Sequence, residues 1–433
     1  MDRPLRALHV FPLLGEDLRN GSERYAWQLT SALAAAGVQI DVFTTRARRV
    51  VPIGGFSLRW PDEAAGGVSG AGFNVTRFPV MTMPAVVGRA AERAFAWYIG
   101  HARQRLGPMP EDSAEYPGYQ HRVMAALPRW CDRLSFLCRG PISWSMYREL
   151  RSRIARYDIV LVSFFPLLTV PAVVRIARKA GRPVVVLPFF HANDLTNNSH
   201  LLGRALVRAD AALTLTSYSA SHLNRLYPGC RAVDVGAGVD ARGLDPAISG
   251  CRFREKHGLT EREIVLVVGR KEPGKRYRAA LEAFRLLDRS SATLVLIGED
   301  VDHEPINQER VLYLGPVSTN ELWDAYDACD VLLHCSRLES FGFVFIEAWA
   351  RGKPVIGDAF SPDVAALIED SVDGFLCANT ASMAERLRTL LDDPALRDRM
   401  GEAGRAKTLA TYTWPAVAAK VRAVYEECIA RRS

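Results

Sequence analysis

Short apolar runs rich in Val, Ile and Leu alternate with longer helix-like segments along the chain. The runs of strand length in its first half are Leu5–Phe11, Val38–Thr44, Asp158–Ser163, Val184–Pro188 and Ala211–Thr216. After the first of them, Glu23–Ala36 has the pattern of a helix, and Gly37 is a typical stop signal. Continuous apolar runs separated by helices are typical of parallel strands joined by crossover helices. The first half therefore predicts a parallel-sheet domain.

The alternation begins afresh after VGAGVDARGLDPAISG, a stretch rich in Gly, Ala and Asp that ends near residue 250. The strand-like runs that follow it are Glu263–Gly269, Ala292–Gly298, Val311–Leu314, Asp330–Cys335 and Pro354–Gly357. They predict a second parallel-sheet domain. Ligands of open parallel sheets bind outside the carboxyl ends of the strands. The expected fold class is α/β, with two Rossmann-like doubly wound parallel-sheet domains facing across a cleft.

The composition is that of an ordinary globular protein. The chain has 433 residues, 48% of them hydrophobic and 24% charged, which again suggests two domains. Because no apolar run reaches the roughly 18 residues that cross a bilayer, and no signal peptide is recognisable, we expect a cytoplasmic location. Eight cysteines without a C-x-x-C pair indicate mostly buried, reduced thiols. The basic residues form no run interleaved with aromatics, so nucleic acid is not an expected partner.

Most of the formal charge of +7 comes from residues 85–157, where twelve arginines face six acidic residues, a net +6. The same stretch holds Trp97, Trp130 and Trp144. Arginines and tryptophans on short helices suit a segment lying on an anionic membrane surface, with the rings at headgroup level. The alternative is an insertion whose helices pack on the domain and whose arginines are solvated. Both interpretations stay open.

Three loops that follow predicted strands carry side chains capable of chemistry: GRKEPGKRY, FFHAND and SRLESFGF. In the first loop the basic side chains around Gly274 are Arg270, Lys271, Lys275 and Arg276. Such side chains beside a glycine-containing turn suit a phosphate or diphosphate, because arginine can clamp two oxygens and lysine supplies a point charge. A solvated basic turn is the alternative.

The segment RLESFGFVFIEAWARGKPVIG, residues 337–357, places Glu339 and Glu347 eight residues apart. Gly342 is the predicted start of a helix, so the amides of Phe341, Gly342 and Phe343 would lie at its positive end and could receive an anion. Glu347 lies in a helix that is apolar on nearly every face, where a carboxylate needs hydrogen-bond donors. Sugar hydroxyls are such donors, and a salt bridge to a buried Arg or Lys is the alternative. The whole pattern fits a nucleotide-sugar.

These residues resemble a known family. SRLESFGFVFIEAWARGKPVIG is similar to the E-x7-E motif of the retaining glycosyltransferases of family 4, usually S-x-x-E-G-F-G-x-x-x-x-E-A-x-A-x-G-x-P-V-I. Further stretches resemble that family in its order and spacing: VFPLLGEDLRNGSERYAWQLTSALAAAGVQIDVFTT, VGAGVD, VVGRKEPGKRY, YLGPVSTNELWDAYDACDVLLHCS, SVDGFL and YTWPAVAAKVRAVYEE. The resemblance covers nearly the whole chain.

The resemblance implies a GT-B fold. Residues 1–240 would form the Rossmann-like acceptor domain, with the Arg/Trp-rich insertion at about 85–157. Residues 241–413 would form the nucleotide-sugar donor domain, and 414–433 a helix returning toward the first domain. The implied reaction moves a sugar from a UDP- or GDP-sugar to an acceptor hydroxyl with retention of anomeric configuration.

The resemblance also implies roles for residues of the second domain. Glu339 would contact the donor-sugar hydroxyls and Glu347 the ribose, while Arg270 and Lys275 would hold the diphosphate. No metal and no cofactor is implied, since these cations and a helix N-terminus can stabilise the departing diphosphate.

In the first domain, His191 of FFHAND matches the histidine that family members place near the reacting sugar, and Asp194 is a candidate substrate-binding residue in the same loop. Gly21 lies in the N-terminal loop, which reads NGSE where the family usually has two adjacent glycines. A structural histidine and a plain turn glycine are the alternatives. We expect Cys335 to be buried, and Ser340, in place of a glycine, to fit if its backbone is not left-handed.

Two routes to retention stay open, double displacement through an enzymic nucleophile and same-face attack in which the leaving diphosphate accepts the proton. We favour the second, because no carboxylate pair is placed as in glycosidases. The rivals are a GT-B enzyme of other chemistry, such as a nucleotide-sugar epimerase or a phosphorylase, and a non-catalytic nucleotide-sugar-binding protein. The acceptor would be a glycan, lipid-linked if residues 85–157 contact the inner face of the cell membrane. No motif specifies the donor base or the oligomeric state.

Overall fold

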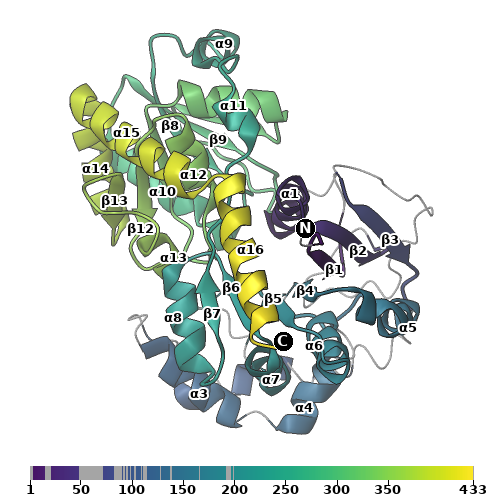
Figure 1. Cartoon of the computed structure of the whole chain (residues 1–433). Coiled ribbons are helices and arrows are strands. Elements are labelled where there is room, and N and C mark those ends of the chain that lie inside the picture. The colour runs from purple at the N-terminus through teal and green to yellow at the C-terminus, as the bar shows by residue number, and fades with distance from the viewer. Residues whose placement is uncertain are drawn as a thin grey trace. The chain divides into compact units, whose positions relative to one another are not determined.

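The computed structural model describes residues 3–14, 21–47, 72–81, 115–126, 128–136, 139–164, 166–191 and 199–432, with single residues and short runs at 90, 93, 96–97, 99–101, 104–108, 110 and 197. The chain divides into two compact units (Figure 1). Unit 1 is Met1–Gly238 together with Trp414–Ser433, and unit 2 is Val239–Thr413.

Unit 1 is built on a seven-stranded sheet in the order β3-β2-β1-β4-β5-β6-β7, in which every neighbouring pair is parallel. Its strands are β1 (Arg6–Phe11), β2 (Gln39–Thr45), β3 (Asn74–Phe78), β4 (Ile159–Ser163), β5 (Val184–Leu187), β6 (Ala211–Thr214) and β7 (Ala232–Asp234). Its helices are α1 (Gly21–Ala35), α3 (Tyr116–Ala126), α4 (Arg129–Ser135), α5 (Trp144–Arg153), η3 (Ile154–Arg156), α6 (Thr169–Lys179), α7 (His200–Arg208), α8 (Ser217–Leu226) and α16 (Trp414–Ala430).

Unit 2 is built on a six-stranded parallel sheet in the order β10-β9-β8-β11-β12-β13. Its strands are β8 (Glu263–Val268), β9 (Ala292–Ile297), β10 (Val311–Gly315), β11 (Val331–His334), β12 (Val355–Asp358) and β13 (Gly374–Cys377). Its helices are η5 (Ala241–Leu244), α9 (Gly250–Lys256), η6 (Pro273–Lys275), α10 (Tyr277–Leu287), α11 (Thr319–Ala328), α12 (Phe343–Ala350), α13 (Pro362–Ala365), α14 (Thr380–Asp392) and α15 (Pro394–Thr411).

The central strands explain why the sequence pattern is continuous rather than alternating. Every residue of β4, β5 and β6 is buried in unit 1, and the same holds for β9, β11 and β12 in unit 2. Helices cover both faces of a parallel sheet, so both side-chain directions of its strands must be apolar. The predicted fold class, two doubly wound parallel-sheet units, is confirmed.

Residues 116–157 contribute to the core of unit 1. Apolar side chains from α3, α5 and η3 join the buried cluster of that unit, among them Met124, Met146, Leu150 and Ile154. The tryptophans of the predicted insertion at 85–157 behave differently, since the exposed fractions of Trp97, Trp130 and Trp144 are 68%, 66% and 60%. The helices therefore pack on the sheet and leave these rings on the surface.

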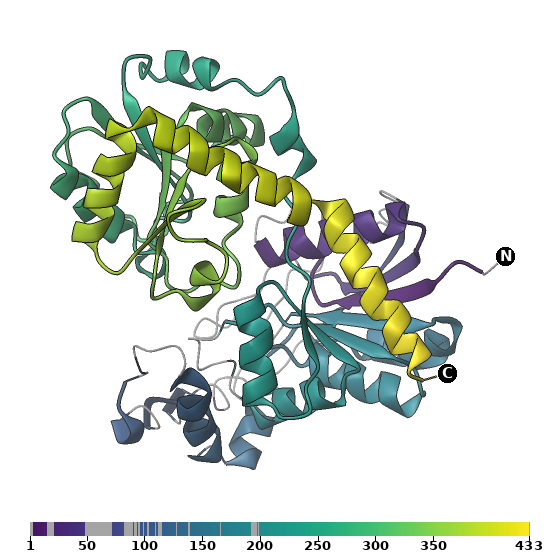
Figure 2. The ribbon, with the colours of Figure 1, turned by 60° about the vertical axis from the view of Figure 1, so that its left-hand side comes forward.

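The C-terminal helix α16 belongs to unit 1 and packs against α1 (Figure 2). The hydroxyl of Tyr425 on α16 lies 3.2 Å from Nε2 of His9 on β1. His9 is fully buried, and burial lowers its pKa to about 3. A neutral imidazole thus joins the helix to the sheet. Among the described residues, no helix is long and apolar enough to cross a membrane.

Candidate functional site

The candidate site lies where the strand order of unit 2 reverses. Along the chain, β8 is followed outward by β9 and β10, and the chain then returns to place β11 beside β8. The carboxyl ends of β8 and β11 are therefore neighbours, as Leu266 pairs with Leu332. At such a switch point the loops after the two strands form a ligand site. Here they are residues 269–276 and 335–342.

The turn before α12 is fixed by a glycine. Gly342 is the N-cap of α12 and has a φ of 91°, a conformation that L side chains rarely adopt. A Cβ on Gly342 would also lie 2.7 Å from the ring of Phe345, which is fully buried. The predicted helix start at Gly342 is confirmed, and the first-turn amides of α12 give this end of the helix a positive dipole. Ser340, in contrast, does not have a positive φ, so the condition under which serine was expected to fit in place of glycine is met.

Glu339 joins the two loops. Its Oε1 lies 2.6 Å from Nζ of Lys275 and 3.0 Å from Nε2 of His334. Burial by itself would raise the pKa of the Glu339 carboxyl, but the hydrogen bond from His334 and the charge of Lys275 outweigh burial and hold that pKa well below its usual range. Within the described part of the chain, Oε2 of Glu339 makes no hydrogen bond. The site thus presents an ionised carboxylate with one oxygen held and the other available to a hydroxyl donor.

Glu347 lies inside α12 and is 5% exposed. The hydroxyl of Tyr326 on α11 donates to its Oε2 over 2.7 Å. Aromatic rings pack around the turn before α12. The ring of Phe341 contacts those of Phe343 and Tyr412 at centroid distances of 5.6 and 5.5 Å. Phe341 is buried, whereas Phe343 is half-buried at the start of the helix.

The basic loop after β8 divides into side chains with different surroundings. The guanidinium of Arg270 is half-exposed and pairs with Glu272 at 2.8 Å. Lys271 is only 1% exposed and lies between Asp300 and Asp302, at 2.7 and 2.5 Å. The prediction that Lys271 belongs to a phosphate-binding cluster is therefore wrong, because two carboxylates already neutralise its charge. The local pattern gave no sign of these partners, which come from the loop after β9.

Asp358, at the end of β12, was not predicted. Its fully buried carboxylate pairs with Arg276 from the β8 loop and with Nε of Arg337 from the β11 loop, at 3.0 Å for the latter. Arg276 has a left-handed backbone with a φ of 52°, and the guanidinium of Arg337 also lies 4.7 Å over the ring of Phe360. Asp358 thus ties together the loops after β8, β11 and β12. Its position directly after a buried strand was the one signal in the sequence.

The remaining predicted residues belong to unit 1. His191 is half-buried and follows β5 after Phe189, whose φ is 48° and whose ring packs edge-on against Tyr25 at 5.4 Å. The carbonyl of His191 accepts a hydrogen bond from Nδ2 of Asn197 over 3.3 Å. Gly21 is the exposed first residue of α1. Asp194 lies outside the described residues.

Unit 2 thus gathers Lys275, Glu339, Glu347 and the 341–343 turn, with Arg270 on the same loop but paired with its neighbour. His334 and Tyr326, which hold the two glutamates, were missed as site residues. A histidine at a strand end, five residues before Glu339, could have indicated the first. Across the described part of the chain, no cluster of three or more His, Cys, Asp or Glu side chains could hold a metal ion.

Comparisons with known proteins add the family and the fold. Residues 252–407 match the sequence model of the family described as "Glycosyl transferases group 1". The chain is 28% identical over 319 residues to a sulfoquinovosyl transferase of Arabidopsis thaliana, covering 66% of this chain and 61% of that protein. It is 30% identical over 256 residues to a D-inositol 3-phosphate glycosyltransferase of Kineococcus radiotolerans, covering 52% and 59%. The chain thus spans about three fifths of the length of these relatives.

Two solved structures resemble the whole chain. HepE of Anabaena, in complex with UDP and glucose, superimposes with a TM-score of 0.65 at 14% identity, over 98% of this chain and 100% of that one. Sucrose-phosphate synthase of Thermosynechococcus elongatus superimposes with a TM-score of 0.68 at 16% identity and the same coverage. The chain has the GT-B fold, with two Rossmann-like units, and its residues 252–407, which contain the site, match glycosyl transferases group 1.

Proposed function

We propose that the chain is a glycosyltransferase that moves a sugar from a nucleotide-sugar to an acceptor hydroxyl with retention of anomeric configuration. The observation that carries the proposal is the pair formed by Lys275 and Glu339 at the switch point of unit 2, beside the start of α12. This pair lies within the segment that matches glycosyl transferases group 1. UDP is the first nucleotide to test, because the similar structure of HepE contains it.

In this proposal the diphosphate lies between the basic loop and α12. Lys275 donates one N–H to Glu339 and has two more to give to phosphate oxygens. Arg270 is half-exposed and can exchange Glu272 for a diphosphate oxygen. The dipole of α12 adds to both charges. These groups would stabilise the leaving diphosphate without a metal ion.

The glutamates would hold the two sugars of the donor. Oε2 of Glu339 accepts from a hydroxyl of the transferred sugar, and Lys275 and His334 keep this carboxylate ionised and oriented. Glu347 accepts a hydrogen bond from a ribose hydroxyl, and the hydroxyl of Tyr326 holds the Glu347 carboxyl group by donating to its Oε2. Both roles place side-chain oxygen acceptors in a partly buried site, and the hydrogen bond to the ionised Glu339 would be charge-assisted.

For the transfer itself we propose same-face attack. The acceptor oxygen forms the new bond to the anomeric carbon as the bond to the diphosphate breaks, and the departing diphosphate oxygen takes the acceptor proton. His191 would lie near the reacting sugar, with Gly21 and Asp194 in the same unit available to donor or acceptor. Trapping a covalent glycosyl-enzyme would replace this route by double displacement. The acceptor we propose is a polysaccharide or lipid-linked glycan.

The test is nucleotide release from UDP- and GDP-sugars with and without candidate acceptors, followed by NMR of the product's anomeric proton. Release that requires acceptor, with the donor configuration kept, supports the proposal. Sugar conversion without nucleotide release would mean an epimerase, and binding without turnover a non-catalytic protein.

A matched control exists in the same unit. Glu321 pairs with Lys256 at 2.6 Å and with His257 at 2.9 Å, which copies the arrangement around Glu339. We expect Glu339→Gln to lower kcat by about 100-fold or more, because it removes a charge that acts on the reacting sugar. Glu321→Gln should leave kcat unchanged. Equal losses in the two variants would contradict the assignment of the site.

A further inference from the structure

Unit 1 has a groove between α5 and α6 that the proposed reaction does not use. Its volume is about 550 Å³, and its walls include Tyr147, Ile154, Leu168, Ile176 and Leu201. The rim carries Trp144, Arg151, Arg175 and Lys179. The groove is therefore an apolar trough edged by cations.

A second groove is lined by residues of α3, α7 and α8. Its volume is about 630 Å³, and its apolar wall includes Met124, Val207, Leu226 and Tyr227. Its basic side chains are Arg129, Arg204 and Arg208, with His121 and His200 beside them. Both grooves include residues of α7, Leu201 in the first and Arg204, Val207 and Arg208 in the second.

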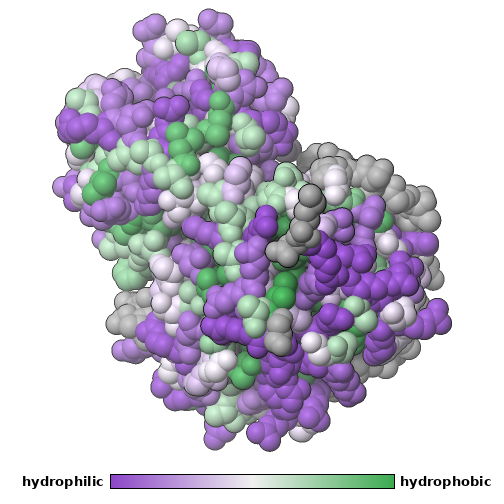
Figure 3. Space-filling view, in the orientation of Figure 1, coloured by the Kyte–Doolittle hydropathy of each residue, from purple (hydrophilic) through white to green (hydrophobic). Residues whose placement is uncertain are grey.

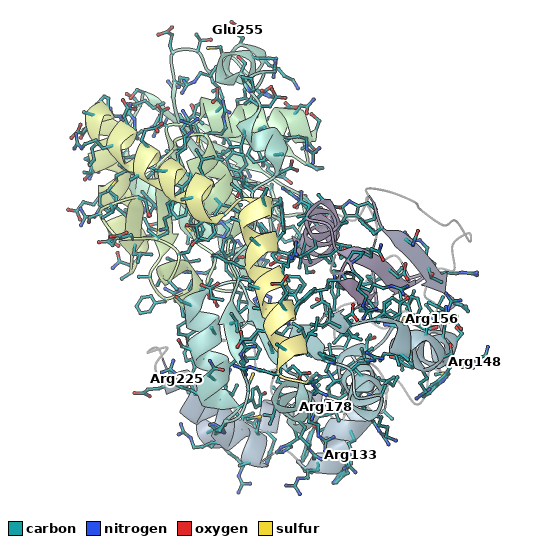
Figure 4. All side chains as sticks on the ribbon, viewed as in Figure 1. Arg133, Arg148, Arg156, Arg178, Arg225 and Glu255 are labelled. Atoms are coloured by element: carbon teal, nitrogen blue, oxygen red, sulfur yellow. The ribbon has the colours of Figure 1, made fainter. Side chains whose placement is uncertain are left out.

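The charged side chains that line the two grooves are all basic or histidine. No carboxylate lines either groove among the described residues, and none of their six Arg and Lys side chains forms an ion pair there. Unit 2 is different, because most of its arginines are paired, as Arg252 is with Asp324 and Arg289 with Glu263. Figure 4 labels further arginines of unit 1 on α4, α5, η3, α6 and α8, namely Arg133, Arg148, Arg156, Arg178 and Arg225. All five are exposed, and Arg178 pairs with Asp210 at 3.7 Å. Among the described residues, the six cations of the grooves therefore have no carboxylate partner within this chain.

Exposed tryptophans accompany these cations. Trp144 is the first residue of α5, and its ring nitrogen is held by the sulfur of Met81 at 2.9 Å while 60% of the residue stays exposed. Trp130, on α4 next to Arg129 of the second groove, is 66% exposed. Figure 3 shows that hydrophilic residues cover much of the described surface on the face that it draws. Amphipathic rings beside Arg and Lys are the composition of a segment at the membrane–water interface.

We propose that the surface formed by α5, α6 and α7 with the two grooves docks on a membrane that contains anionic phospholipid. The cations would meet lipid phosphates, Trp130 and Trp144 would lie at headgroup level, and the apolar grooves would take acyl-chain segments. A soluble phosphate would satisfy the charges but leave the apolar walls exposed to water. Nucleic acid would match the charge but not the troughs. The inference is independent of the glycosyltransferase proposal, and binding without a spanning helix would be peripheral.

The experiment is co-sedimentation with vesicles of phosphatidylcholine, with and without phosphatidylglycerol, at low and physiological ionic strength and without nucleotide. We expect the wild-type chain to bind the anionic vesicles and to bind less as salt rises. The groove variant is Arg151→Glu, Arg175→Glu and Lys179→Glu together, which should lower the partition coefficient on the order of 100-fold. Trp144→Ala removes the ring without changing charge. It should lower binding to the anionic vesicles at physiological ionic strength.

The control changes net charge equally on exposed arginines of unit 2, as Arg285→Glu, Arg399→Glu and Arg405→Glu. Circular dichroism establishes that each variant folds. Loss in the groove variant with binding kept in the control supports the proposal. Equal loss in both would show that only net charge matters and would overturn it, as would failure of the wild type to bind anionic vesicles. Capture of tRNA through the same side chains, without vesicle binding, would also overturn it.

Discussion

Substitution of Asp358 by Asn should lower both the free energy of unfolding and the affinity for UDP, and a matched control can distinguish the two effects. Asn keeps the volume of the buried side chain but removes the charge that Arg276 and Arg337 share. Hydrogen bonds to a charged group contribute about 1.5–3 kcal/mol each. The two guanidiniums are 32% and 39% exposed, so each can regain water when the carboxylate is lost. The free energy of unfolding of unit 2 should therefore fall by about 2–3 kcal/mol, which corresponds to roughly 5–10 °C in Tm.

The same substitution should weaken donor binding. Arg276 follows Lys275 directly, and Arg337 lies two residues before Glu339, so loss of Asp358 frees both loops that carry the site. A small misplacement of binding groups costs on the order of 10-fold to 100-fold in affinity or rate. Urea denaturation followed by circular dichroism measures the stability, and isothermal titration with UDP measures the affinity.

Asp324→Asn is the matched control. Asp324 is 5% exposed, receives two hydrogen bonds from Arg252 at 2.6 and 2.7 Å, and contacts neither of the loops that Asp358 joins through its ion pair. It should destabilise the chain by a similar amount and leave UDP affinity unchanged. If Asp358→Asn weakens UDP binding no more than Asp324→Asn does, Asp358 is a purely structural residue and the reasoning about the three loops is refuted.

Three further predictions concern single positions. Arg276→Gly should be about 1 kcal/mol more stable than Arg276→Ala in urea denaturation, because a φ of 52° suits glycine, and the reverse order would contradict the left-handed backbone. Gly342→Ala should lower stability by about 2–4 kcal/mol, since φ is 91° and the new Cβ would meet Phe345, and a neutral result in the same assay would refute the cap geometry. Because the folded-state pKa of Glu339 lies below its ordinary 4.5, its stabilising effect is present above about pH 4.5 and is lost as pH falls further. Thermal melts should show a shallower loss below about pH 4.5 for Glu339→Gln than for wild type, and parallel curves would contradict the shift.

The fold could be predicted from the sequence wherever a strand is buried on both faces, because such a strand is a continuous apolar run. All ten apolar runs named from the sequence are strands, with ends that differ by one or two residues. The strands that escaped prediction are β3, β7 and β13, which lie at the edges of the two sheets. Edge strands are short and partly solvated, so NVTRF and AVD lack the continuous apolar pattern. Helix starts were readable where a glycine or a cap fixed them, as at Gly342.

The site could be predicted only in part. The motif residues lie close together in the sequence, whereas several of their partners lie far away in it. Glu339, Gly342 and Glu347 share one segment, and their spacing carries the prediction. Two partners that decide which cations are available lie far away in the chain, Asp302 at 31 residues from Lys271 and Asp358 at 82 residues from Arg276. Local composition suggested four equivalent basic side chains. Tertiary contacts pair two of them with carboxylates, Lys271 with Asp300 and Asp302 and Arg276 with Asp358.

The measurement that tests the central claim most directly is isothermal titration of UDP into the wild-type chain and two double variants. One is Lys275→Ala with Glu339→Gln, and the other is its counterpart, Lys256→Ala with Glu321→Gln. The account predicts that the wild type and the Lys256/Glu321 variant bind UDP equally, and that the Lys275/Glu339 variant binds on the order of 100-fold more weakly. Equal UDP affinity in all three proteins would contradict the assignment of the Lys275–Glu339 pair as the donor site.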